Sequence, residues 1–221
     1  MTFRTTLLMK QFVTHDVLRF VVARPDGFDF EPGQGVDLAI DADGWHEQSR
    51  PFTPTSLAHD KVLEFTIKIY AEHAGVTDAL AHLQPGAALT ISEPWGSIRY
   101  KGPGVFIAGG AGITPFLAIV RHMRGENLLP GHGLIFANKT PADVICEKEL
   151  RTTFGTRANF LVDGGASPGF GAGRVDEALL KRLIVDWDQH FYVCGPPPFN
   201  DAVMLALRQL GAQPEALIFE Q

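Results

Sequence analysis

The apolar residues of this chain change their spacing near residue 101. Before that point, short apolar segments are separated by turn-forming residues, which is typical of β-sheet proteins. After Lys101-Gly102-Pro103-Gly104, apolar segments of strand length alternate with segments of helix length. Two such different patterns in one chain predict two domains, over residues 1–100 and 104–221.

The first pattern predicts an antiparallel β-barrel, because its strands are short and its helices are few. One helix is expected over Thr77–Leu83, with Thr77 as its N-cap. The expected strands are Val17–Ala23, Gly35–Ile40 after the turn Glu31-Pro32-Gly33-Gln34, Val62–Tyr70 and Ala88–Ser92.

The second pattern predicts a doubly wound parallel sheet of the α/β class, because strands alternate with helices. Such sheets bind ligands in a crevice beyond the carboxyl ends of their strands. The expected strands are Val105–Ala108, Gly133–Ala137, Asn159–Val162, His190–Val193 and Ala216–Phe219. The expected helices are Pro115–Arg124, Val144–Leu150, Val175–Leu183 and Phe199–Leu210.

Composition argues against several functional classes. The chain has 19 basic and 25 acidic residues, a net charge of −6, and no Lys/Arg cluster that would bind nucleic acid. Its two cysteines, Cys146 and Cys194, are too few for a four-thiolate iron–sulfur centre, and its histidines lack metal-ligand spacing. The apolar runs are too short to cross a bilayer, and the N-terminus lacks a signal-peptide pattern. We therefore expect a cytoplasmic monomer with no metal.

A glycine-rich loop follows the first strand of the α/β half. In Gly109-Gly110-Ala111-Gly112-Ile113-Thr114-Pro115, Gly110 and Gly112 would let the backbone approach a diphosphate closely. Thr114 is expected to cap the next helix and Pro115 to occupy its first position, so that the helix N-terminus faces the anion. The usual dinucleotide fingerprint has a third glycine where this chain has Pro115, and an ordinary tight turn is the alternative.

A second segment of interest is Cys194-Gly195-Pro196-Pro197-Pro198, again at a strand end. The prolines fix a rigid edge of the crevice, and the polarizable sulfur of Cys194 would lie against a flat ring. The alternative is a buried structural thiol, which is the interpretation adopted for Cys146.

Two segments of the barrel half carry phosphate-binding chemistry. Arg50-Pro51-Phe52-Thr53-Pro54-Thr55-Ser56 offers a cation, an aromatic face and hydroxyls, although a proline-rich surface turn would contain the same residues. Gly75-Val76-Thr77-Asp78, at the start of the expected short helix, offers a second anion site or a plain helix cap.

Taken together and in this order, RPFTPTS, AGVTDAL, FIAGGAGITPFLAIV and FYVCGPPPF resemble the ferredoxin–NADP reductase superfamily. The most similar branch is the cytochrome-b5-reductase-like and flavodoxin-reductase-like group. The resemblance covers nearly the whole chain, and it implies an FAD-binding barrel followed by a domain that binds NADH or NADPH.

The resemblance also implies roles for individual residues. Arg50 with Pro51 would hold the flavin diphosphate, Phe52 would stack on the flavin ring where the family usually has tyrosine, and Thr53 would lie near the flavin N5. Cys194 would lie against the nicotinamide, and Glu220 is a further catalytic candidate. The other residues implied to bind a cofactor are Ser56, Ile67, Tyr70, Gly75, Val76, Thr77, Gly110, Gly112, Thr114, Pro115, Gly195 and Pro196.

The implied activity is hydride transfer between NAD(P)H and FAD, with electrons passed to a separate acceptor such as a flavodoxin, ferredoxin or cytochrome. A ferric-siderophore or free-flavin reductase on the same fold, and a regulator that binds flavin or nucleotide without turnover, are the alternatives. NADH is expected to be preferred, because Asp163 follows the strand Asn159–Val162 and would repel a 2′-phosphate; Lys139 and Arg174 are the opposing cations.

Overall fold

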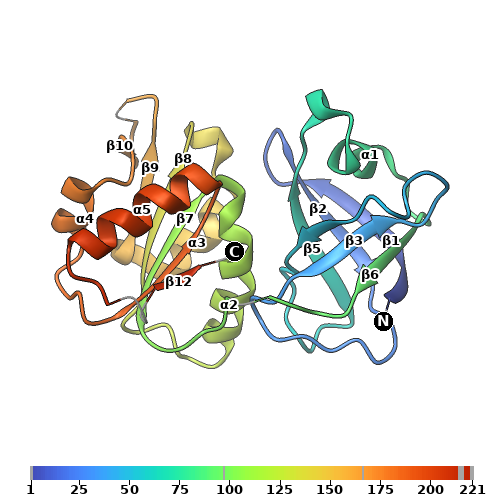
Figure 1. Cartoon of the computed structure of the whole chain (residues 1–221), viewed down its shortest axis with the longest axis horizontal. Coiled ribbons are helices and arrows are strands. Elements are labelled where there is room, and N and C mark those ends of the chain that lie inside the picture. Colours follow the sequence, from blue (N-terminus) through green and yellow to red (C-terminus); the bar gives the residue numbers. More distant parts are fainter. Residues whose placement is uncertain (1, 97, 166, 214–216, 220–221) are drawn as a thin grey trace.

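The computed structural model describes residues 2–96, 98–165, 167–213 and 217–219. It contains two sheets side by side, an antiparallel one from the first half of the chain and a parallel one from the second (Figure 1). The expected fold class, a barrel followed by a doubly wound α/β domain, is confirmed. No helix among these residues is long and apolar enough to cross a membrane.

The first sheet has six strands in the order β4-β3-β6-β1-β2-β5. It curls into a nearly closed barrel, because Pro54, just after β4, forms a bridge to Phe65 on β5, at the opposite end of this order. The strands are β1 Thr2–Phe12, β2 Val17–Ala23, β3 Val36–Ile40, β4 Arg50–Phe52, β5 Val62–Lys68 and β6 Ala88–Ser92. One short 3₁₀ turn, η1 Ala71–His73, and one helix, α1 Val76–His82, lie between β5 and β6.

The second sheet is parallel, in the order β10-β9-β8-β7-β11-β12. Its strands are β7 Gly104–Gly109, β8 Gly133–Asn138, β9 Ala158–Val162, β10 Gly171–Ala172, β11 His190–Cys194 and β12 Leu217–Phe219. Its helices are α2 Thr114–Gly125, α3 Glu147–Phe154, α4 Glu177–Leu183 and α5 Pro197–Gln209, with 3₁₀ turns η2 Gly110–Ile113, η3 Pro141–Asp143 and η4 Gly155–Arg157.

Side chains alternate between the two faces of the parallel sheet. Phe106, Phe136 and Tyr192 pack with α2 and α3, whereas Ile107 and Phe191 pack with α4 and α5. Helix α2 lies between this sheet and the barrel (Figure 1). By the same alternation, Cys194 shares the face of Tyr192, and it is grouped with that side of the core.

Several sequence expectations need correction. The predicted helix Val144–Leu150 begins instead at Glu147, because Cys146 has a left-handed backbone (φ 53°) that ends the preceding turn. Thr77 does not cap α1, since Gly75 occupies the N-cap position. Strand β1, which the sequence analysis missed, has exposed apolar side chains and a register shift between Leu7 and Met9 that breaks the period-2 pattern.

Burial raises the pKa of the Cys146 thiol to about 11.

The two halves pack through apolar contacts on α2. Val17, from barrel strand β2, is buried in the cluster that includes α2. A Cβ atom added to Gly33 would lie 2.2 Å from the Ile98 carbonyl oxygen and 2.9 Å from the Ile119 side chain on α2. The turn around Gly33 therefore sits directly on this helix, where no side chain larger than hydrogen fits.

Replacing Gly33 with alanine should destabilise the protein more than replacing Gly27, although both have positive φ (96° and 74°). Left-handed backbone costs an alanine about 1–2 kcal/mol at either site. Only Gly33→Ala adds a steric clash, worth about a further 1–3 kcal/mol, because no described residue lies within 4 Å of a Cβ at Gly27. Urea unfolding of both variants measures the difference, and equal losses would contradict the packing described here.

Candidate functional site

The strand order of the parallel sheet reverses at β7, which has β8 on one side and β11 on the other. Ligands of doubly wound sheets bind beyond the carboxyl ends of the strands at such a reversal. Here the two loops that begin at this position are the glycine-rich turn Gly110–Ile113 and the segment after Cys194. The topology therefore brings the two motifs of the α/β half to one crevice.

These two loops touch each other. A Cβ atom on Gly112 would lie 2.2 Å from the carbonyl oxygen of Cys194 and 2.6 Å from the amide nitrogen of Gly195. Below them the Phe199 ring packs so closely that a Cβ at Gly109 or Gly195 would lie 3.0 or 2.5 Å from it. Glycine is required at these positions because another backbone or an aromatic ring occupies the side-chain space.

The start of α2 differs in detail from the expectation. The helix begins at Thr114 itself, and Ile113 stands in the N-cap position without a side-chain cap. The Thr114 hydroxyl donates to the Ala111 carbonyl oxygen at 3.0 Å, so it closes the turn before the helix. Pro115 falls within the first two helical residues, where its missing N–H costs nothing. The N-terminus of α2 still adjoins the glycine turn and favours an anion there.

Asn138, at the carboxyl end of β8, is a residue that the sequence analysis missed. It is 8% exposed, and among the described residues neither its side-chain oxygen nor its nitrogen has a hydrogen-bond partner. It directly follows Ala137, which pairs with Gly109 on β7, and its carbonyl accepts the Asp163 amide at 3.2 Å. A buried amide without partners is costly, which is consistent with a polar ligand near the glycine turn. Its sequence signal is a polar residue ending an apolar strand.

Asp163 and Arg174 form an exposed pair beyond the end of β9. Their side-chain nitrogen and oxygen are 3.8 Å apart, and the two side chains are 51% and 88% exposed. Lys139, next to Asn138, is also exposed. Asp163, Arg174 and Lys139, which bear on the expected preference for NADH, are therefore all accessible to a nucleotide.

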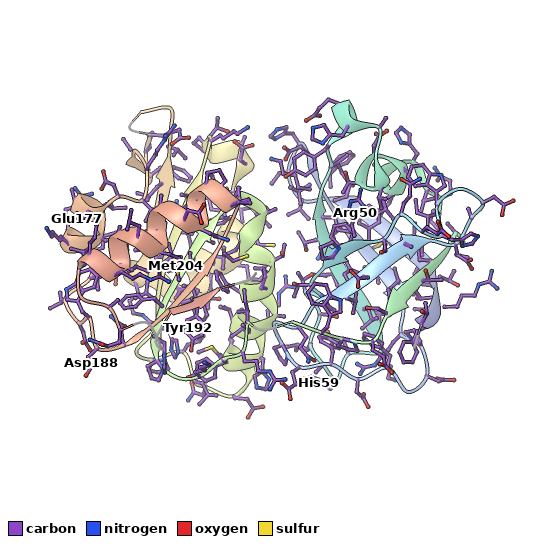
Figure 2. All side chains as sticks on the ribbon, in the orientation of Figure 1. Arg50, His59, Glu177, Asp188, Tyr192 and Met204 are labelled. Atoms are coloured by element: carbon purple, nitrogen blue, oxygen red, sulfur yellow. The ribbon has the colours of Figure 1, made fainter. Side chains whose placement is uncertain are left out.

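On the barrel, the Arg50 motif forms edge strand β4 on β3, which suits Pro51 because an edge strand tolerates a missing N–H. Arg50 is exposed (Figure 2), and its guanidinium donates to the Ser49 carbonyl oxygen at 2.8 Å. Phe52 is half-buried, whereas Thr53 is buried at 6% exposure. The exposed cation, the half-buried ring and the buried hydroxyl thus lie along one short strand and its continuation.

For four other residues predicted to bind the flavin, the side chain is buried in the core or already makes a hydrogen bond within the protein. The side chains of Ile67 and Val76 lie in the barrel core, so only their backbone can reach a ligand. Ser56 is buried, and its hydroxyl accepts the Glu64 amide at 3.1 Å. The Thr77 hydroxyl accepts the Tyr70 amide at 3.3 Å.

The Tyr70 ring is 39% exposed and stacks on His73, with ring centroids 5.5 Å apart. Near it, a Cβ on Gly75 would have one neighbour within 4 Å among the described residues, the His73 carbonyl oxygen at 3.9 Å. An exposed aromatic face and an open glycine suit a nucleotide. Pro196 directly precedes α5, and Glu220 lies outside the described residues.

Among the described residues, one group has the composition of a metal site: His15, Asp16 and Asp143, whose ligand atoms lie within 4.8 Å of one another. The Lys68 ammonium is 2.6 Å from the Asp16 carboxylate. Burial alone would raise the pKa of Asp16, but the hydrogen bond from Lys68 leaves it lowered. An ion pair therefore already supplies the positive charge at this group.

Comparison with known proteins matches both halves. Residues 4–100 match the oxidoreductase FAD-binding domain family, and residues 106–204 match the oxidoreductase NAD-binding domain family. The chain is 31% identical over 223 residues to the reductase component of propane 2-monooxygenase from Mycolicibacterium smegmatis, covering 92% of this chain and 63% of that protein. It therefore spans about 63% of the length of that relative.

Two further comparisons agree. NADH-cytochrome b5 reductase 1 of Ajellomyces capsulatus is 29% identical, over 95% of this chain and 74% of that protein. The FAD/NAD-binding domain of a nitric oxide dioxygenase from Vibrio cholerae has the same fold, with a TM-score of 0.88 at 20% identity, covering 99% of this chain and 97% of that one. The resemblance inferred from the four motifs is confirmed.

Replacing Gly112 with alanine should force the glycine turn away from Cys194, because the added carbon would meet backbone atoms that cannot move independently. We expect reduction of the bound flavin by NADH to slow by roughly tenfold to a hundredfold, with FAD content unchanged. Gly125→Ala is the matched control at the other end of α2, where the new Cβ has no neighbour within 4 Å in the described part of the chain. Rapid-mixing absorbance measures both; a wild-type rate in Gly112→Ala would contradict the role of this contact.

Proposed function

Because this chain belongs to the ferredoxin–NADP reductase superfamily of FAD- and NAD-binding oxidoreductases, we propose that it moves electrons from NAD(P)H to a separate acceptor. The observation that carries the proposal is the contact between Gly112 and Cys194 at the reversal of the parallel sheet. It joins the two loops that the family uses for the nicotinamide dinucleotide. We place the domain boundary between residues 100 and 104.

The bound flavin supplies the chemistry, since it can accept a hydride and release the two electrons singly. The chain's residues bind, orient and shield the cofactors. On this proposal Arg50 holds the flavin diphosphate together with the backbone of Gly75, Val76 and Thr77. Phe52 provides a stacking face, and it lacks the tyrosine hydroxyl, a difference of about 1 kcal/mol if that hydroxyl would have donated a hydrogen bond.

On the nucleotide side, the backbone of Gly110 and Gly112 and the N-terminus of α2 would hold the coenzyme diphosphate. Cys194 and Gly195 would form the surface against which the nicotinamide lies, on the face of the sheet that carries α2. The Asn138 amide would donate to or accept from the coenzyme, which satisfies its unpaired atoms. The Thr53 hydroxyl would be available to the flavin from the barrel side.

The acceptor is proposed to be a protein, either an oxygenase component or a small electron carrier. Support comes from the relative whose name describes a reductase component of a monooxygenase. We propose that the protein works as a monomer in the cytoplasm.

An anaerobic experiment tests this function. Adding NADH or NADPH to the purified yellow protein should bleach the flavin, and a panel of flavodoxin, ferredoxin, cytochrome, ferric chelate and free flavin should then show fastest reoxidation by a protein carrier. A flavin that stays oxidised would indicate a binding protein without turnover. Fastest reoxidation by ferric chelate or free flavin would instead support a reductase of small acceptors.

The accessible pair Asp163–Arg174 predicts a preference for NADH. Asp163 holds Arg174 and repels a 2′-phosphate, and one charge-assisted contact is worth about 1.5–3 kcal/mol. We expect kcat/KM for NADH to exceed that for NADPH roughly tenfold to a hundredfold. In Asp163→Ser, the ratio of the two kcat/KM values should be smaller.

Asp188→Ser is the matched control, because it removes an exposed carboxylate before β11, at the amino end of the sheet (Figure 2). Its kcat/KM ratio should equal that of the wild type. An NADPH value at or above the NADH value in the wild type would refute the preference. Lys139→Ala would then test whether that lysine contacts the phosphate.

A further inference from the structure

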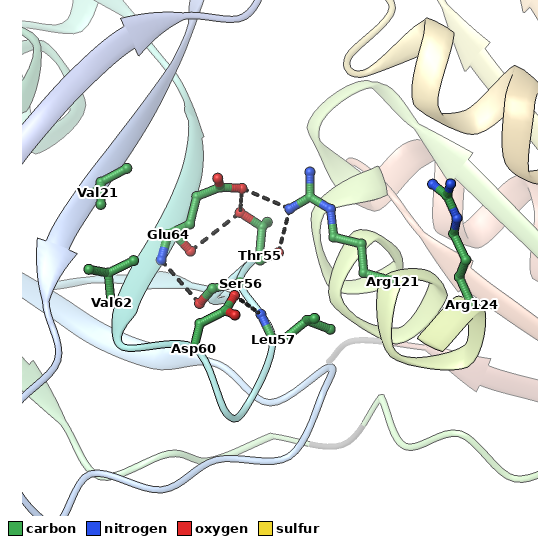
Figure 3. Close-up of a pocket in the computed structure, with 9 residues that line it drawn as sticks. All are labelled: Val21, Thr55, Ser56, Leu57, Asp60, Val62, Glu64, Arg121 and Arg124. Atoms are coloured by element: carbon green, nitrogen blue, oxygen red, sulfur yellow. Dashed lines mark hydrogen bonds and ion pairs between the residues drawn. The ribbon is translucent and has the colours of Figure 1, made fainter. Parts of the chain in front are cut away.

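Arg121, on α2, joins the two domains through its guanidinium (Figure 3). On its own side it donates two hydrogen bonds to the Glu149 carboxylate of α3, at 2.7 and 2.8 Å. Across the interface it donates to the Glu64 carboxylate of β5 at 2.8 Å and to the Thr55 carbonyl oxygen at 2.5 Å. Four directional hydrogen bonds thus converge on one planar group between the barrel and the nucleotide domain.

The barrel partners of Arg121 are continuous with the proposed flavin site. Thr55 is fully buried, and its hydroxyl donates to the Glu64 carboxylate at 2.8 Å and lies 3.1 Å from the Thr66 hydroxyl. Its amide donates to the Glu64 carbonyl at 2.6 Å. Thr55 follows Thr53 by two residues, so the backbone that positions the Thr53 hydroxyl is fixed at the point where Arg121 binds.

The other end of Arg121 leads to the proposed coenzyme site. Arg121 lies about two helical turns after Thr114, on the helix whose N-terminus carries the glycine turn. Glu149 accepts both ends of the guanidinium fork and so fixes its plane relative to α2 and α3. Donation from Arg121 lowers the pKa of Glu149, which keeps that carboxylate ionised.

Apolar packing does not hold the domains together at this point. Beside Arg121 is a cavity of about 340 Å³, lined from the barrel by Thr55, Ser56 and Glu64 and from α2 by Arg121 and Arg124. Close apolar contacts lie elsewhere, where Gly33 meets Ile119 and where Val17 is buried in the cluster that includes α2. On the cavity side, the hydrogen bonds of Arg121 fix how the barrel segment lies against α2.

We propose that Arg121 is a positioning residue for hydride transfer: it sets the barrel segment Thr53–Ser56 against the N-terminal half of α2, and so aligns the two cofactor sites. This inference rests on the proposed function for its reaction. Removing Arg121 alone leaves the Glu64 and Glu149 carboxylates without their cation, which also destabilises the protein, so the test has to separate the geometry of the fork from stability.

The test compares Arg121→Met and Arg121→Lys with wild type in the FAD-loaded protein. Arg124→Met is the matched control, since Arg124 lies on the same helix, lines the same cavity, and makes no hydrogen bond among the residues drawn in Figure 3. Three quantities are measured: FAD content with coenzyme Kd, the flavin reduction rate with the long-wavelength charge-transfer absorbance, and hydrogen exchange across residues 53–56 and 114–121.

For Arg121→Met we expect flavin reduction roughly tenfold to a hundredfold slower, weaker charge-transfer absorbance and faster exchange in both segments, with FAD content and coenzyme Kd within about twofold of wild type. Arg121→Lys, which keeps the charge and loses the fork, should fall between, and Arg124→Met should match wild type. Unchanged rate and exchange in Arg121→Met would overturn the proposal, as would a rate lost only together with FAD.

If Arg121→Met fails to fold, Glu149→Gln and Arg121→Lys decide the matter by the same measurements, and wild-type values in both would overturn the proposal. Should the wild-type flavin not be reduced by either coenzyme, the proposed function fails and with it the link to hydride transfer. The exchange data then still show separately whether Arg121 couples the two segments.

Discussion

The structure depends on helix α2 being packed on both sides. Phe116 and Leu117 are buried among the residues of the parallel sheet, while Ile119 meets the barrel turn at Gly33. A helix buried on two faces cannot rotate or slide without disrupting one of them, because protein interiors are close-packed. Its N-terminus, which carries the glycine turn, and its middle, which carries Arg121, therefore have fixed positions relative to both domains.

The sequence predicted the elements whose residues interact locally. The alternation of strands and helices after residue 104 was confirmed, and strands β2 and β6 have the predicted bounds. Strand β1 was missed because Leu8, Met9 and Phe12 are exposed apolar residues, so the inward and outward positions do not differ in polarity. The start of α3 was misplaced because Val144 and Ile145 are buried in a turn and fit a helical pattern equally well.

The residues of the candidate site likewise divide into those that the sequence predicted and those that it did not. Gly112 and Cys194 were expected near one crevice, because the carboxyl ends of parallel strands share one edge, and the structure places them in contact. Asn138 and Arg121 were not predicted. The burial of Asn138 depends on neighbouring strands, and Arg121 takes its partners from positions 57 and 28 residues away. No local pattern in one sequence records such long-range partners.

The thiols of this chain have a consequence for its chemical durability. Attack by peroxides or disulfides requires the thiolate form and solvent access. Cys146 is half-buried with a pKa of about 11, so its thiolate is scarce at neutral pH. Cys194 is 4% exposed. Both sulfurs are therefore poor targets for such attack in the folded protein.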